Sequence, residues 1–337
     1  MPGGQLSRYV PLFKQARVAV LGDLMLDRYV WGRATRISQE APVPVVAVQR
    51  QSAVPGGAAN VARNLRTLGA AVDVFGVIGD DLEGQELLRR LAEAEADISW
   101  VEVDSSRPTT VKTRVLAGNQ QVVRIDYEQT REVAPELRRR LLNSLEKQLR
   151  SGTVQALILE DYAKGLFGRQ FMRQAIALAQ SYQVMVALDP HPSNNFKANG
   201  LCLMTPNRAE AFALAKVPYQ SGNDDPRSDR ALLRAGQRLR QTWAPEHLLV
   251  TLGAGGMALF SGEDSLPVHI PTKAKQVFDV SGAGDTVMAT MVLAMLAGAS
   301  LPEAAEIANH AAGVVVGLVG TAAIDADALI ASIDSPT

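Results

Sequence analysis

Short apolar runs alternate with longer amphipathic segments over most of the chain. Runs with the length and continuous hydrophobicity of buried strands lie at residues 17–22, 72–77, 155–159, 184–188, 201–204 and 247–251. Segments with apolar residues at helical spacing lie at residues 85–95, 135–149, 167–181, 208–215 and 230–242. This alternation of strands and helices predicts an α/β fold with a mostly parallel sheet flanked by helices.

Two stretches do not follow this alternation. Residues 28–52 contain Pro42 and Pro44 followed by a β-branched run, so no helix fits there. Residues 109–115 and 122–126 alternate as the strands of a hairpin around Gly118 and Asn119. We expect residues of about 28–52 and 107–126 to form a small β lid over the active edge of the sheet, where it would exclude water.

Polar side chains follow the carboxyl ends of several predicted strands, which is where ligands gather in open α/β sheets. Asp23 and Asp27 follow the first strand, and the alternative is that they only solvate a loop. The others are Asp189 after residues 184–188, Asn207 and Glu210 after 201–204, and Thr251, Gly253 and Gly256 after 247–251. Asn207 and Glu210 could also be an ordinary capping pair, and the glycine turn could be only a hairpin.

Residues 278–287, FDVSGAGDTV, predict a strand end, a turn of small residues and the first turn of a helix. The backbone amides of Gly282, Ala283 and Gly284 would meet an anion at the helix N-terminus. Bound phosphate repels a carboxylate, so Asp285 makes sense there if it accepts a proton from a hydroxyl that attacks phosphorus. The alternative is that Asp285 only caps the helix. G-x-G-x-x-G is excluded because position 287 is Val, and no P-loop pattern occurs.

Composition narrows the class of protein. The 337 residues are 47% apolar, which allows a large core and one or two domains. A net charge of −1 and a pI near 6.5 argue against a nucleic-acid surface or a polybasic membrane anchor. Cys202 is the only cysteine, and the four histidines show no metal-ligand spacing. Because neither a signal peptide nor an uninterrupted apolar run of about 20 residues is present, we expect a cytoplasmic protein.

The run from Asp279 to Thr286, DVSGAGDT, resembles the C-terminal signature of the ribokinase-like (PfkB) carbohydrate kinases, D-[TV]-[TS]-[GA]-A-G-D. The resemblance covers roughly residues 10–333, and it implies one doubly wound kinase domain over residues 1–337. It also implies ATP, Mg²⁺ and probably K⁺ as cofactors. By position, Asp285 would be the catalytic base, the amides of Gly282, Ala283 and Gly284 the anion hole, and Asp279 a ligand of the monovalent cation.

The same resemblance assigns further positions. Asp27, Gly56, Gly57 and Asn60 match the sugar site, and Asn207 and Glu210 match an N-x-x-E motif that organises Mg²⁺ through water. Thr251, Gly253 and Gly256 match the nucleotide turn, Asn309 a position near the adenine, and residues 317–323 the cation loop.

Within the family, the chain is most similar to the heptose branch, the bacterial D-glycero-β-D-manno-heptose-7-phosphate kinases of ADP-heptose synthesis. Stretches that carry this similarity are GDLMLDRYVWG (22–32), RISQEAPVPVV (36–46), PGGAANVARN (55–64), TVKTRVLAGNQQVVRID (110–126) and LEDYAKG (159–165). Relatives often carry a nucleotidylyltransferase domain after the kinase, and we expect none here. Glu160 and His191 depart from the serine and lysine that relatives usually have.

This branch implies phosphorylation of the anomeric hydroxyl of a heptose 7-phosphate. Basic side chains could clamp its distal phosphate, namely Arg36, Lys112, Arg114, Arg124 and Lys164. The apolar edges of the lid strands lead us to expect a homodimer through the lid. Two alternatives stay open, which are a kinase for another sugar or sugar phosphate, and a non-catalytic sensor of sugar or nucleotide.

Overall fold

Strand β1 (Arg17–Gly22) lies inside the central sheet, with β4 (Ala71–Ile78) and β8 (Ala156–Glu160) hydrogen-bonded to it in parallel on either side. The computed structural model describes residues 6–118, 120–222, 225–262, 266–274, 277–318 and 320–335. Within them the sheet has nine strands in the order β13-β12-β11-β10-β9-β8-β1-β4-β5. Their bounds are Val268–Ile270, Met257–Ser261, His247–Thr251, Leu203–Met204, Met185–Asp189, Ala156–Glu160, Arg17–Gly22, Ala71–Ile78 and Asp97–Val103. Among these described strands, only the pairs β11–β12 and β12–β13 are antiparallel, which confirms the mostly parallel sheet.

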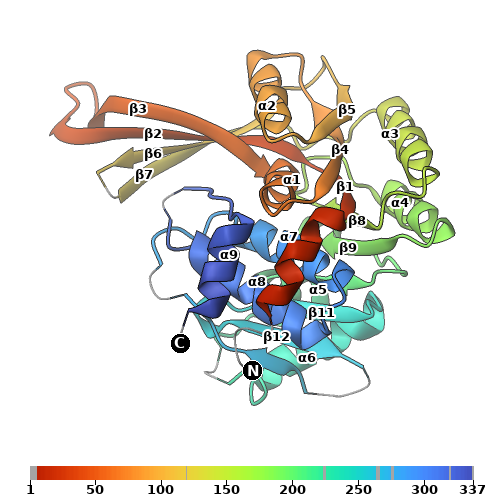
Figure 1. Cartoon of the computed structure of the whole chain (residues 1–337). Helices are drawn as coiled ribbons and strands as arrows, with labels where there is room; N and C mark the ends of the chain where they lie inside the picture. Colours follow the sequence, from red (N-terminus) through yellow and green to blue (C-terminus); the bar gives the residue numbers. More distant parts are fainter. Residues whose placement is uncertain are drawn as a thin grey trace.

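Helices cover both faces of this sheet (Figure 1). The alternation along β1 shows why, because Val18 and Val20 enter one hydrophobic core while Ala19 and Leu21 enter the other. The helices are α1 (Ala58–Thr67), α2 (Leu82–Glu93), α3 (Pro135–Leu149), α4 (Arg169–Ser181), α5 (Arg208–Ala215), α6 (Arg230–Thr242), α7 (Ala283–Leu296), α8 (Leu301–Val315) and α9 (Ala326–Asp334). The prediction of a sheet flanked by helices is therefore confirmed. Within the described ranges, none of these helices combines the length and hydrophobicity needed to cross a membrane.

A separate four-stranded sheet projects from one end of the body (Figure 1). Its order is β3-β2-β6-β7, with bounds Pro44–Gly57, Leu24–Ile37, Thr110–Ala117 and Gln120–Tyr127. We call it the lid sheet. Strand β2 begins at Leu24, before the predicted start of the lid at about residue 28. Asp27 therefore lies within β2, opposite Val54, and not in a loop after β1. Asn119, the second residue of the expected hairpin turn, lies outside the described residues.

Two short elements differ from what the sequence pattern suggests. A 3-10 helix at Ser7–Gln15 precedes β1 and contributes Tyr9, Val10 and Phe13 to the core. The glycine turn after β11 includes the 3-10 turn Gly253–Gly255 and connects to β12, which pairs antiparallel with β11. The hairpin alternative for this turn is therefore present in the structure.

Candidate active site

Asp285 lies in the first turn of α7 and accepts two hydrogen bonds, one on each carboxylate oxygen. Asn60 Nδ2 from α1 donates to Oδ2 at 2.7 Å, and the Tyr162 hydroxyl donates to Oδ1 at 2.6 Å. Burial raises the pKa of Asp285, and the bonds from Tyr162 and Asn60 lower it in part. The carboxylate is thus held in one orientation, as proton transfer from a bound hydroxyl requires.

Tyr162 belongs to the turn after β8, and sequence reasoning did not assign it to the site. Burial, followed by the charge of Asp285, raises the pKa of its phenol well above the usual value, so the hydroxyl stays protonated and donates. Asp23 shapes this turn, because its Oδ2 accepts from the backbone N–H of Tyr162 at 2.9 Å and of Lys164 at 3.1 Å. Asp23 therefore positions Tyr162, and its burial contradicts the alternative that it only solvates a loop.

Gly282 precedes α7 with φ of 79°, in the left-handed region that favours glycine. A Cβ at this position would lie 2.7 Å from Asn60 Nδ2 and 3.0 Å from Thr321 Cγ2. A Cβ on Gly284 would meet nothing within 4 Å, so this side of the helix start is open. Glycine at 282 is thus needed for Asn60 to reach Asp285, while the N-terminus of α7 remains open at Gly284.

Three carboxyl groups converge beside this helix start. Glu160 and Asp189 are register partners at the ends of β8 and β9, and their oxygens lie within 4.8 Å of one another and of an Asp285 oxygen. Glu160 is fully buried, and neither of its oxygens has a hydrogen-bond partner in the part of the chain that the structure describes. Burial, followed by the charges of Asp189 and Asp285, raises the pKa of Glu160 well above its usual value. Burial of an unpaired carboxylate costs free energy, so we expect this cluster to hold a proton or to bind a cation.

The lid sheet places Asp27 next to the site. Asp27 Oδ1 pairs with Arg114 Nη1 at 2.8 Å, and its Oδ2 accepts from the Thr321 hydroxyl at 3.0 Å. A Cβ on Gly56 would lie 2.7 Å from Asp27 Oδ2, so the glycine leaves room for this carboxylate. Gly57, with φ of 54°, ends β3 and leads into α1 and Asn60. The predicted sugar-site residues are therefore neighbours.

The five basic residues that were predicted to bind a distal phosphate do not all lie together in the structure. Lys112 lies with Nζ 5.6 Å from the centre of the Tyr162 ring, and burial, followed by the charge of Lys164, lowers its pKa. Lys164 pairs with Glu128 at 2.8 Å.

Arg124, half exposed on β7, is the cross-strand partner of Arg114 and pairs with Asp126 at 2.8 Å. One of the five lies farther out. Arg36 is exposed and lies nine residues beyond Asp27 (36 − 27) on β2. At roughly 3.3 Å per residue, that is about 30 Å along the strand. Lys112, Arg114 and Lys164 thus lie beside Asp27 and Tyr162, Arg124 lies next to Arg114, and Arg36 lies apart.

Asn207 and Glu210 form a capping box at the start of α5. Glu210 N–H donates to Asn207 Oδ1 at 3.0 Å, and Asn207 N–H donates to Glu210 Oε2 at 2.8 Å. Burial raises the pKa of Glu210, whose charge in turn acts on Asp189. The capping alternative is therefore present, and the charge of Glu210 still acts on both Asp189 and Glu160.

The candidate nucleotide residues lie at the adjacent strand end. Thr251 bridges in parallel to Asn207. Gly256 has φ of 81°, and a Cβ there would lie 2.1 Å from Ile270 O, so only glycine fits. Asn309, buried in α8, donates its amide to Pro271 O at 2.6 Å and so anchors the segment after β13 to this helix.

Asp279 is joined to the loop that follows α8. Its Oδ1 accepts from Ser281 N–H at 2.9 Å, and its Oδ2 accepts from Gly320 N–H at 3.1 Å. The N–H groups of Phe278 and Asp279 donate to Val316 O. The structure thus brings together the two segments expected to form a cation loop, of which Val319 lies outside the described residues.

Solved structures place this architecture in one fold class. The structure of Arabidopsis thaliana ribokinase complexed with ribose and ATP covers 95% of this chain and 99% of its own, with a TM-score of 0.70 and 19% identity. Phosphofructokinase-2 from Escherichia coli in complex with potassium covers 95% and 99%, with a TM-score of 0.74 and 18% identity. The fold is therefore ribokinase-like.

The sequence comparison names the family. The model of the pfkB family carbohydrate kinases matches residues 15–328, and the chain belongs to this family. It is 42% identical over 314 residues to the bifunctional protein HldE of Geobacter sulfurreducens, covering 93% of this chain and 62% of that protein. It is also 42% identical over 306 residues to HldE of Helicobacter pylori, covering 91% and 64%. The chain thus spans less than two thirds of the length of these relatives.

Proposed function

We propose that this chain transfers a phosphoryl group from ATP to the anomeric hydroxyl of D-glycero-β-D-manno-heptose 7-phosphate. The product would be the 1,7-bisphosphate, a precursor of ADP-heptose and lipopolysaccharide. The observation that carries the proposal is Asp285, buried at a helix N-terminus and oriented by Asn60 and Tyr162, in a chain of the pfkB family. The identity of about 40% to proteins named HldE supports the heptose as acceptor.

In this reaction Asp285 would accept the proton of the attacking hydroxyl, and the start of α7 would bind the anion. Asn60 Oδ1 is buried and finds no hydrogen-bond partner within the described ranges, so it is suited to accept a bond from a sugar hydroxyl. Asp27 offers a second acceptor at the lid side. The amides of Gly282, Ala283 and Gly284 would bind the transferred phosphoryl group, as expected for an anion hole at a helix start.

Kinases of this family use ATP and Mg²⁺. The unpartnered oxygens of Glu160, with Asp189 and Glu210 beside them, fit a divalent cation because it would offset their charge. We assign Glu210 the role of holding Mg²⁺ through water. When bound, the ion supplies charge neutralisation at the phosphates. Asp279 and the carbonyls of the loop after α8 would hold K⁺ beside the anion hole.

Binding of a distal phosphate would fall first to Lys112. Among the residues that the structure describes, Lys112 forms no ion pair, whereas Arg114 and Lys164 already pair with Asp27 and Glu128. Arg36 lies too far along β2 to share that phosphate with Lys112 within one chain.

The lid sheet also supports a homodimer. Large apolar side chains are exposed on its strands and the β2–β3 turn, namely Ile37, Val43, Val48, Val122, Val123, Ile125 and Tyr127. A second lid packed against them would remove this surface from water. We place the protein in the cytoplasm, where ATP is supplied.

The test compares acceptors under saturating MgATP: D-glycero-D-manno-heptose 7-phosphate, the free heptose, ribose and fructose 6-phosphate. Two charge-assisted bonds of about 1.5–3 kcal/mol each predict a preference for heptose phosphate over free heptose of about 100-fold or more in kcat/KM. Equal kcat/KM for the free heptose would refute the distal phosphate site. A failure to turn over any sugar would favour the non-catalytic sensor.

A matched pair of variants locates that phosphate site. Lys112→Gln should remove most of the preference for the phosphosugar. Lys147→Gln is the control, because Lys147 also lies over an aromatic ring, 5.5 Å from the centre of Trp100, but on α3 at the outer face. If both variants keep the preference, Lys112 does not bind the phosphate.

A further inference from the structure

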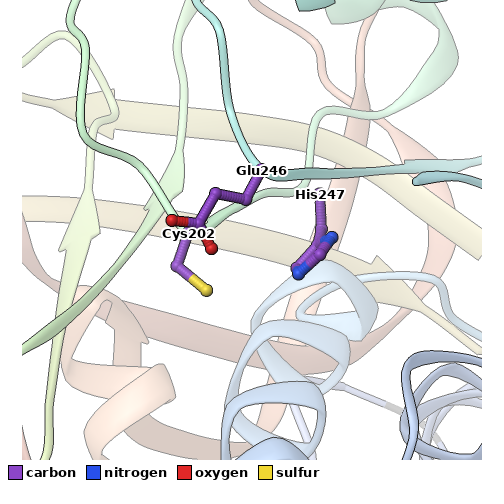
Figure 2. A group of neighbouring side chains, drawn as sticks. All are labelled: Cys202, Glu246 and His247. Atoms are coloured by element: carbon purple, nitrogen blue, oxygen red, sulfur yellow. The ribbon is translucent and has the colours of Figure 1, made fainter. Parts of the chain in front are cut away.

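A second cluster of metal-ligating side chains lies away from the active site, where β10 and β11 begin. Cys202 precedes β10, Glu246 precedes β11 and His247 is its first residue. One ligand atom from each lies within 4.8 Å of the other two, and Figure 2 shows the three side chains gathered there. The strands run parallel, so this cluster is at their N-terminal edge, whereas Asn207 and Thr251 follow at the other edge.

The three side chains differ in kind from the acidic cluster around Asp285. A thiol, an imidazole and a carboxylate are the ligand set that Zn²⁺ takes in proteins, whereas a set of carboxylates alone suits Mg²⁺. His247 Nδ1 is buried and has no hydrogen-bond partner among the described residues. Within the described part of the chain, no lysine or arginine forms an ion pair with Glu246. The cluster therefore holds a free donor atom and an unbalanced charge.

We propose that Cys202, Glu246 and His247 bind one Zn²⁺ ion, with water as the fourth ligand. Hydrogen bonds already join the two segments, from His247 N–H to Cys202 O at 2.9 Å and from Glu246 N–H to Leu201 O at 2.9 Å. The ion adds a link between the side chains of the same segments. It therefore stabilises the start of the two strands whose far ends carry the candidate nucleotide residues. This site is independent of the proposed kinase reaction.

Charge balance agrees with this ion. The Cys202 proton leaves to solvent as the sulfur–metal bond forms, so one thiolate and the Glu246 carboxylate balance the two positive charges.

The test uses the metal-stripped full chain. Titration with Co²⁺, a spectroscopic substitute for Zn²⁺, should produce a thiolate-to-metal charge-transfer absorption that saturates at one equivalent. Zn²⁺ should displace Co²⁺ and abolish this absorption. Free Zn²⁺ at 100 times its Kd should raise the Tm by about 4 °C, from the mass-action gain and the unfolding entropy of a chain this long.

Three variants and two controls assign the ligands. His247→Asn and Cys202→Ser should each weaken Zn²⁺ binding by at least about 100-fold, because loss of an outer partner alone costs 10- to 100-fold. Glu246→Gln, at an exposed position, should weaken it without disturbing the fold. His310→Asn and Asp285→Asn should bind Zn²⁺ like the wild type. Wild-type affinity in His247→Asn and Glu246→Gln, or more than one Co²⁺ per chain with no thiolate band, would overturn the site.

Discussion

Replacing Tyr162 by phenylalanine removes one of the two hydrogen bonds that Asp285 accepts and keeps the ring under Lys112. The bond is 2.6 Å long and ends on a buried carboxylate. A hydrogen bond to a charged group contributes about 1.5–3 kcal/mol, and one pKa unit corresponds to about 1.36 kcal/mol. Its loss should therefore raise the pKa of Asp285 by about 1–2 units above a value that burial has already raised.

The assay is the pH profile of kcat/KM for sugar phosphorylation, since a catalytic base must be deprotonated to act. Activity is lost as the pH falls through the pKa of Asp285. In Tyr162→Phe this acid limb should move upward by about 1–2 units, while the rate at high pH stays close to that of the wild type. Tyr182→Phe is the control, because the Tyr182 hydroxyl contacts Glu146 at 3.4 Å outside the site. An unmoved acid limb in Tyr162→Phe would refute the role of this bond.

Three further predictions concern stability, cations and assembly. Asp73→Asn should lower the free energy of unfolding by about 3 kcal/mol or more in urea denaturation, because Asp73 is fully buried and accepts 2.8 and 3.0 Å bonds from Arg17 and Gln148; a loss below 1 kcal/mol would contradict this. K⁺ should stimulate turnover through the loop beside Asp279, and equal rates in Na⁺ and K⁺ at one ionic strength would exclude that. Light scattering should show a dimer at micromolar concentration, and a monomer would count against pairing through the lid sheet.

The turn around Asp285 could be predicted from the sequence because its determinants are local. Gly282 adopts φ of 79°, a conformation that favours glycine, and Asp285 follows within one helical turn. The strand end predicted at residue 278 is wrong, because residues 277–282 form no strand and are largely exposed, whereas α7 after them is buried on all sides from Asp285 to Ala294.

Contacts between segments that are far apart in the sequence leave no such local pattern in the chain. Tyr162 and Asp285 are 123 residues apart, and their bond depends on a turn that Asp23 holds through backbone N–H groups. Asp27 follows β1 closely in sequence, yet it lies within a strand because β2 pairs on both sides. Arg36 and Lys112 are both basic, but they lie far apart. Lys112 is opposite Asp27, whereas Arg36 lies farther along β2, and an extended strand advances about 3.3 Å per residue.

The central claim is that Asp285 is the base of a kinase site, and Asp285→Asn tests it most directly. The asparagine keeps the size of the side chain and removes the carboxylate. Turnover with MgATP and the best acceptor should fall by about 100-fold or more, whereas nucleotide affinity and the Tm should stay near the wild-type values. A variant that retains near wild-type kcat would contradict the assignment of Asp285 as the catalytic base.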